Sequence, residues 1–230
     1  MVDEAHPPLY KTLGEIAALW IAADAGYWIV LPLFDIGISY NESPVVIALY
    51  YAFWLFVGIV AFRDSLLRRI HTTQLWSYAV LSLGLSGAAL IALYILSRVP
   101  VPVGTPLAPY TDILFASPWY FLPKAMEILV QQTLVAALVF ALAAHYRSIR
   151  AVSAAYALLF GGAHVIIFSL SGTPTPYAVT MTVGSLASAA LFPFLMLRAK
   201  NGFVYAYAIH VAFYIVLALA LHTWPPPDYP

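Results

Sequence analysis

Residues 121–145 read FLPKAMEILVQQTLVAALVFALAAH, and Lys124 and Glu127 are the only Lys, Arg, Asp or Glu residues in this run. A helix needs about 20 mostly apolar residues to cross the roughly 30 Å hydrocarbon core of a bilayer. Strands of a membrane barrel are only about ten residues long and alternate strictly between apolar and polar residues. The run is longer than such a strand and does not alternate, so it predicts a transmembrane helix.

The composition of the whole chain agrees with a membrane location. Of its 230 residues, 63% are apolar and only 9% are charged, and the mean hydropathy is +0.88. Soluble domains carry about 25% charged residues, so this chain has too few to cover a water-facing surface. Ten Lys and Arg residues balance ten Asp and Glu residues, which argues against nucleic-acid binding because that needs a basic face. The absence of cysteine excludes disulfides, thiolate nucleophiles and cysteine metal sites.

Six further apolar runs flank the one quoted above. The predicted spans are Leu13 to Phe34, Pro44 to Phe62, Leu75 to Ser97, Phe121 to His145, Ala151 to Leu170, Tyr177 to Leu197 and Gly202 to Leu221. The sequence contains no internal repeat and no long linker. We therefore expect an all-α fold, a polytopic membrane helical bundle of about seven transmembrane helices, that forms a single integral membrane domain over residues 1–230.

Most basic residues fall on one side of these predicted spans. That side carries Lys11, Arg63, Arg68, Arg69, Arg147, Arg150, Arg198 and Lys200, whereas Arg98 and Lys124 fall on the other. The positive-inside rule assigns the basic side to the cytoplasm. We therefore predict an integral protein of the plasma (inner) membrane with its amino terminus in the cytoplasm, and with the loop Val99 to Trp119 and the carboxyl terminus outside.

Small residues within the predicted spans favour close approach of helices in lipid. These are Gly84 and Gly87 in the third span, Gly161 and Gly162 in the fifth, and Gly184 in the sixth. We expect all of them to pack against neighbouring helices.

Five ionisable residues lie within the apolar spans, where such groups are costly and usually face a cavity or a partner. They are Glu15, Asp24, Glu127, His164 and His210. Glu15 lies near the cytoplasmic end of the first span, where we expect water or a headgroup to satisfy it. For Asp24 we favour a hydrogen bond between helices over a proton relay. The other three could activate water by general base catalysis, bind a metal as two histidines and a carboxylate, or form a buried hydrogen-bond network.

Two short motifs surround the histidines: Phe160-Gly-Gly-Ala-His164 and His210-Val-Ala-Phe-Tyr214. They resemble the Phe-x-x-x-His and His-x-x-x-Asn motifs of the CAAX protease and bacteriocin-processing (CPBP) family of intramembrane endopeptidases. The first motif of that family, Glu-Glu-x-x-x-Arg, corresponds here to Met126-Glu127-Ile-Leu-Val-Gln131. The resemblance covers residues 121–221, and it implies a CPBP-like helical core.

The departures from the family pattern bear directly on activity. The family's activating glutamate is Met126 here, its arginine is Gln131 and its asparagine is Tyr214. A methionine thioether cannot accept a proton as a base does. If the chain is active, the resemblance implies that four residues are catalytic: Glu127, His164, His210 and Tyr214. It also implies a cavity lined in part by Met126, Gln131 and Phe160.

Three functions are therefore open. We expect a non-catalytic relative with a degenerate active site, which binds membrane lipids and a partner: another membrane protein or a hydrophobic or lipidated peptide. The first alternative is an active endopeptidase that uses Glu127, His164 and His210. The second is a haem or metal carrier through the two histidines. We expect no metal and no cofactor, because Gln131 and Tyr214 add no strong metal ligand. We also expect Glu127→Gln to be tolerated, because the amide keeps the shape of the side chain.

Overall fold

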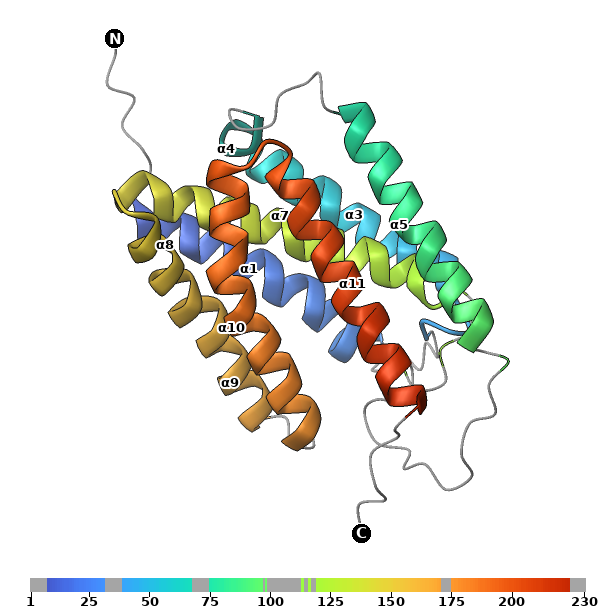
Figure 1. Ribbon diagram of the computed structural model, residues 1–230. Helices are drawn as coiled ribbons and strands as arrows, with labels where there is room; N and C mark the ends of the chain where they lie inside the picture. Colours follow the sequence, from blue (N-terminus) through green and yellow to red (C-terminus); the bar gives the residue numbers. More distant parts are fainter. Residues whose placement is uncertain are drawn as a thin grey trace.

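A computed structural model describes residues 8–31, 39–67, 75–96, 98, 113, 116, 119–170 and 175–223 (Figure 1). All regular secondary structure in these residues is helical. The elements are α1 (Leu9–Ala25), the π-helical turn η1 (Gly26–Val30), α3 (Pro44–Ala61), α4 (Arg63–Leu67), α5 (Leu75–Leu96), α7 (Phe121–His145), α8 (Ile149–Tyr156), the π-helical turn η3 (Ala157–Gly161), α9 (Gly162–Leu170), α10 (Thr175–Arg198) and α11 (Gly202–Thr223). The predicted all-α fold is confirmed.

Five helical segments among the described residues are long and apolar enough to cross a membrane. They are Pro44–Ala61, Phe121–His145, Ile149–Leu170, Tyr177–Arg198 and Gly202–Leu221, and a shorter apolar stretch covers Ala79–Ile95. The third of these segments contains α8, η3 and α9, which follow one another without a break. These helices indicate an integral membrane protein. The first predicted span is helical over its described residues 13–31 but is not among the five, so the count of seven stays a prediction.

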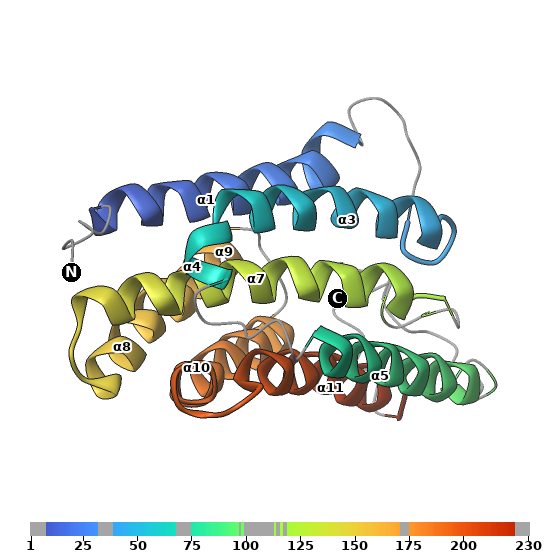
Figure 2. The same cartoon turned by 90° about the horizontal axis from the view of Figure 1, so that it is seen from above.

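Helix α7 lies at the centre of the bundle. Figure 2 shows it between α1 and α3 on one side and α5, α10 and α11 on the other, and it contacts each of these helices. In its most apolar part 67% of the residues are buried, compared with 22% in α3 and in the segment from α8 to α9. The outer helices therefore meet the surroundings of the protein, whereas α7 forms its core.

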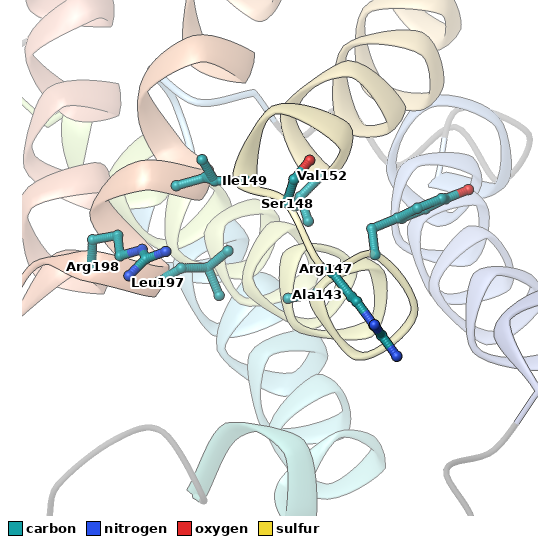
Figure 3. A pocket seen from close by; sticks show the side chains of 8 residues that line it. Ala143, Arg147, Ser148, Ile149, Val152, Leu197 and Arg198 are labelled. Atoms are coloured by element: carbon teal, nitrogen blue, oxygen red, sulfur yellow. The ribbon is translucent and has the colours of Figure 1, made fainter.

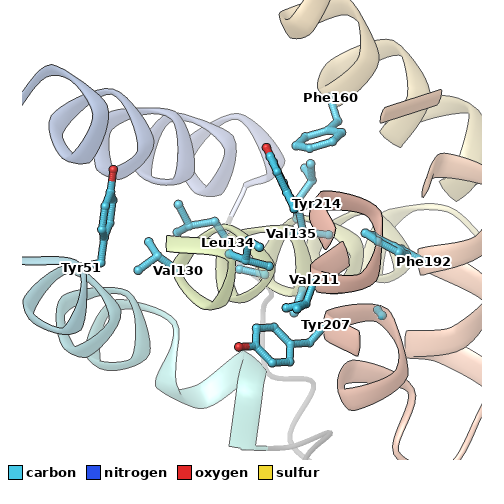
Figure 4. Close-up of a cluster of buried hydrophobic side chains, with 14 of the residues drawn as sticks. Tyr51, Val130, Leu134, Val135, Phe160, Phe192, Tyr207, Val211 and Tyr214 are labelled. Atoms are coloured by element: carbon cyan, nitrogen blue, oxygen red, sulfur yellow. The ribbon is translucent and has the colours of Figure 1, made fainter. Parts of the chain in front are cut away.

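The core around α7 is built from large apolar and aromatic side chains. Val135 of α7 is fully buried, and the same cluster of buried side chains includes Tyr51 of α3, Phe192 of α10 and Val211 of α11 (Figure 4). Most side chains of α7 are therefore shielded by other helices, so a polar group on it is stabilised by a partner within the protein.

The predicted role of the glycines in packing is right at two positions and wrong at three. A Cβ added to Gly161 would come within 2.7 Å of the Leu186 side chain, and one added to Gly184 would come within 3.0 Å of the Phe213 ring. At Gly84, Gly87 and Gly162, no atom of a described residue lies within 4 Å of such a Cβ. Within the described part of the chain, these three glycines therefore permit no close approach of another helix.

A tight turn joins α10 to α11. Asn201 has a left-handed backbone (φ 61°), a conformation that asparagine adopts more readily than most residues. The amide of Gly202 then donates to the carbonyl oxygen of Ala199 at 3.2 Å. A Cβ on Gly202 would overlap the backbone carbonyl of Leu195, so the turn requires glycine at this position.

The ends of the helices separate the basic residues as the sequence predicts. The start of α1, the end of α7, the start of α8 and the end of α10 lie together at one end of the bundle (Figure 1). These helix ends carry Lys11, Arg147, Arg150, Arg198 and Lys200. Arg68, Arg69, the termini and most of the loop Val99 to Trp119 lie outside the described residues. The assignment of the basic end to the cytoplasm stays a prediction.

Candidate functional site

Glu127 lies on the first half of α7 and is 9% exposed. Its Oε2 is 2.8 Å from the Nζ of Lys124, one turn earlier, and 2.7 Å from the hydroxyl of Tyr40. Its Oε1 accepts a hydrogen bond from the Nε2 of Gln131, one turn later, at 2.9 Å. A carboxylate has about four acceptor positions, and here three donors already fill most of them.

Tyr40 connects Glu127 to a second tyrosine. Its hydroxyl lies 3.0 Å from the hydroxyl of Tyr51 on α3. Because a phenol has one proton and a carboxylate can only accept, Tyr40 donates to Glu127 and accepts from Tyr51. Tyr40 precedes α3 and lies outside the helices that could span the membrane. Burial raises the pKa of its hydroxyl well above the ordinary value, and the nearby charge of Glu127 raises it further, so Tyr40 stays a neutral donor.

Lys124 is buried together with Glu127, since each side chain is 12% exposed. Its Nζ lies 4.2 Å from the ring centroid of Tyr214 on α11 and 5.7 Å from that of Tyr40. A cation over an aromatic face is attracted by the ring quadrupole. The ammonium group therefore has one carboxylate and two aromatic rings as partners, in a place where water is scarce.

Asp24 on α1 lies beside this group. It interacts electrostatically with Glu127 and Lys124. The hydrogen bond between helices that the sequence favours for Asp24 stays a prediction.

His164 lies on α9, directly after the π-helical turn η3. Its Nδ1 is 2.8 Å from the carbonyl oxygen of Phe160. A carbonyl oxygen can only accept, so Nδ1 carries the proton and Nε2 keeps its lone pair. The ring centroid lies 4.5 Å from that of Phe160 and 5.8 Å from that of Phe168. The His164 ring is therefore held by aromatic contacts with Phe160 in η3 and Phe168 in α9.

His210 on α11 has a different environment. Its Nδ1 lies 3.3 Å from the Oε1 of Gln132 on α7. Its ring stacks on Tyr214 with a centroid distance of 5.7 Å and an interplanar angle of 27°. Tyr214 thus lies between His210 on one side and Lys124 on the other.

These contacts divide the predicted site residues into two groups. Glu127, Gln131 and Tyr214 meet around Lys124, and His210 joins them through Tyr214. Phe160 and His164 form the second group, and Met126 is half-buried against the core. Between the described residues, no direct contact joins Glu127 to either histidine. The described part of the chain also has no group of three His, Cys, Asp or Glu residues placed to hold a metal ion.

Lys124 and Tyr40 are site residues that the sequence pattern does not single out. The charge pattern assigns Lys124 only to the outer side of the spans, although its spacing of three residues from Glu127 is typical of an ion pair on one helix face. Tyr40 is 87 residues from Glu127 in the chain, and no local pattern reports such a contact.

No family model, curated protein or solved structure matches this chain. The resemblance to the CPBP family therefore rests on the short motifs alone.

Proposed function

We propose that this protein is a non-catalytic relative of the CPBP intramembrane endopeptidases, which binds a peptide, a lipid or another membrane protein instead of cleaving a substrate. The observation that carries the proposal is the occupation of Glu127. A general base needs a free oxygen within reach of the water that it activates. The oxygens of Glu127 instead accept from Lys124, Tyr40 and Gln131.

The outer surface of α9 supports a binding role. None of the residues of α9 is buried, and Val165, Ile166 and Ile167 are 50–60% exposed. Lipid chains or an apolar segment of a partner would cover this surface. In the proposed arrangement the chain spans the plasma membrane seven times, with its amino terminus in the cytoplasm.

One observation favours a second function, the carriage of haem or another metal. His164 and His210 each use Nδ1 for a hydrogen bond within the protein, and neither Nε2 has a partner among the described residues. Histidines that bind metals usually have their other ring nitrogen held in this way. An absorption spectrum of the purified protein separates this function from the first, because a haem would give a strong visible band.

The test of the proposal compares the wild type with two variants. Glu127→Gln removes the carboxylate, and the double variant Lys124→Met/Glu127→Leu removes both charges of the ion pair, so that neither partner is left without the other. Mass spectrometry of new protein N-termini in membranes measures cleavage, and mass spectrometry of co-purifying proteins and lipids measures binding. Size-exclusion chromatography and thermal unfolding in detergent show that each variant is folded.

We expect cells with the wild type, cells with the double variant and cells that lack the protein to contain the same N-termini. We also expect specific proteins or lipids to co-purify with the wild type. An N-terminus that depends on the wild type and disappears with both folded variants would establish the peptidase function and overturn the proposal. Purification of the wild type without any specific companion would also overturn it.

A further inference from the structure

A pocket opens at the basic end of the bundle, where α7 ends, α8 begins and α10 ends. Arg147, in the connection between α7 and α8, and Arg198, in the last turn of α10, line its two sides (Figure 3). Val152 and Leu197 belong to its apolar lining. At 1.5 Å per residue along α7, this pocket is roughly 28 Å from Lys124, so it is separate from the polar group around Glu127.

No described residue neutralises the charges of the two arginines. Each is exposed, and neither has an ion pair or a hydrogen bond with another described residue. The connection that carries Arg147 is nevertheless fixed, because the Ser148 side chain caps α8 by accepting from the amide of Ala151 at 3.1 Å. An arginine presents a planar fork of donors that matches the oxygens of a phosphate group.

The surface next to the pocket on its membrane side is apolar. Leu191 and Phe194 precede Arg198 by seven and four residues on α10, so all three lie on one face of the helix. Leu191 is 39% exposed and Phe194 is 52% exposed. A ligand with a charged head and apolar chains would contact this face along its whole length, whereas a free anion would use only the arginines.

We infer that this pocket binds the phosphate of an anionic phospholipid, with Arg147 and Arg198 on the headgroup and Leu191 and Phe194 along the acyl chains. Basic pockets between membrane helices at the cytoplasmic side are a known way of holding anionic headgroups. The inference does not depend on the function proposed above, since it uses none of the residues around Glu127.

The test uses the purified protein in nanodiscs of phosphatidylcholine with or without phosphatidylglycerol. Native mass spectrometry measures the phosphatidylglycerol retained by the protein, and titration gives its affinity. The variants are Arg147→Gln, Arg198→Gln, their combination, and a double lysine variant that keeps the charges but removes the planar forks. Arg150→Gln is the matched control, because Arg150 is exposed in the first turn of α8, three residues after Arg147, but does not line the pocket.

We expect each glutamine variant to weaken phosphatidylglycerol binding about fivefold, and the combination about 25-fold, since a basic residue at a membrane surface contributes about 1 kcal/mol. The double lysine variant should be intermediate and Arg150→Gln should bind as the wild type does. Equal loss in Arg150→Gln would show a general surface charge effect and overturn the inference. Unchanged binding in the combined variant, or stabilisation by inorganic phosphate in pure phosphatidylcholine equal to that by phosphatidylglycerol, would overturn it too.

Discussion

The ion pair between Lys124 and Glu127 determines how single substitutions act in the core. Removal of one partner from a buried pair leaves an uncompensated charge and costs about 3–5 kcal/mol, whereas replacement of both by apolar residues is often nearly neutral. The sequence alone suggested that Glu127→Gln would be tolerated. The contact at 2.8 Å with Lys124 reverses that expectation, because the amide cannot neutralise the ammonium group.

We therefore predict that Glu127→Gln and Lys124→Met each lower the free energy of unfolding by about 3–5 kcal/mol. The double variant Lys124→Met/Glu127→Leu should lose much less than the sum of the two. These differences are measured by unfolding the proteins in mixed micelles with an increasing mole fraction of denaturing detergent. A double variant that is less stable than both single variants would show that Lys124 and Glu127 do not depend on each other as an ion pair.

Tyr40→Phe removes the donor that reaches Glu127 from outside α7. A buried acceptor that loses its partner costs about 1–3 kcal/mol, and we expect this loss in the same unfolding assay. Tyr10→Phe is the control, because Tyr10 is 78% exposed and should tolerate the change. Equal stability of the wild type and Tyr40→Phe would mean that Glu127 does not need this hydroxyl.

The raised pKa of Tyr40 also predicts how stability changes with pH. An unfolded tyrosine loses its proton near pH 10, whereas the folded protein keeps the Tyr40 proton to higher pH. The unfolded state then binds fewer protons than the folded state, so stability falls as the pH rises above about 10. This fall should be less steep in Tyr40→Phe than in the wild type. Parallel pH profiles of the two proteins would contradict the assignment.

At the scale of the elements, the turn between α10 and α11 restricts the sequence most, because it requires glycine at position 202. Gly202→Ala places a methyl group against the backbone carbonyl of Leu195, which cannot move aside as a flexible side chain can. We expect a loss of about 1–3 kcal/mol or more from this overpacking. Gly84→Ala, in the helix α5, has open space around the new methyl group and should gain up to about 1 kcal/mol from helix propensity. Thermal unfolding of the two variants measures this contrast, and a stable Gly202→Ala protein would refute it.

The sequence predicts helices far better than it predicts their contacts. The span Phe121 to His145 matches α7 residue for residue, because an uninterrupted apolar run has only one stable form in a membrane. The packing of Gly84 and Gly87 was predicted wrongly, since a small residue does not reveal which helix lies opposite it. The partners of Glu127 were found in part: Gln131 follows from helical spacing, but Tyr40 depends on how α3 packs against α7.

At the scale of the whole molecule, the orientation in the membrane can be tested directly. The chain has no cysteine, so single cysteines report the side on which they lie. Lys200→Cys lies at the basic end, and Trp119→Cys, at a residue 58% exposed, lies just before α7 at the other end. We expect a membrane-impermeant maleimide to label Trp119→Cys in intact cells and Lys200→Cys only after lysis. The opposite pattern would place the basic end outside.

The central position of α7 also bears on how the protein is made. This helix carries a buried lysine and a buried glutamate. Tyr40, which donates to Glu127, and Tyr51, which donates to Tyr40, belong to the part of the chain that the ribosome completes earlier. We expect α1 and α3 to be inserted in the bilayer before α7 leaves the translocon, so that partners for the charged side chains of α7 are already present. A nascent chain whose α3 is replaced by a polyleucine helix should therefore insert α7 poorly, because the charged side chains of α7 have no partners in lipid alone. Glycosylation mapping measures this insertion.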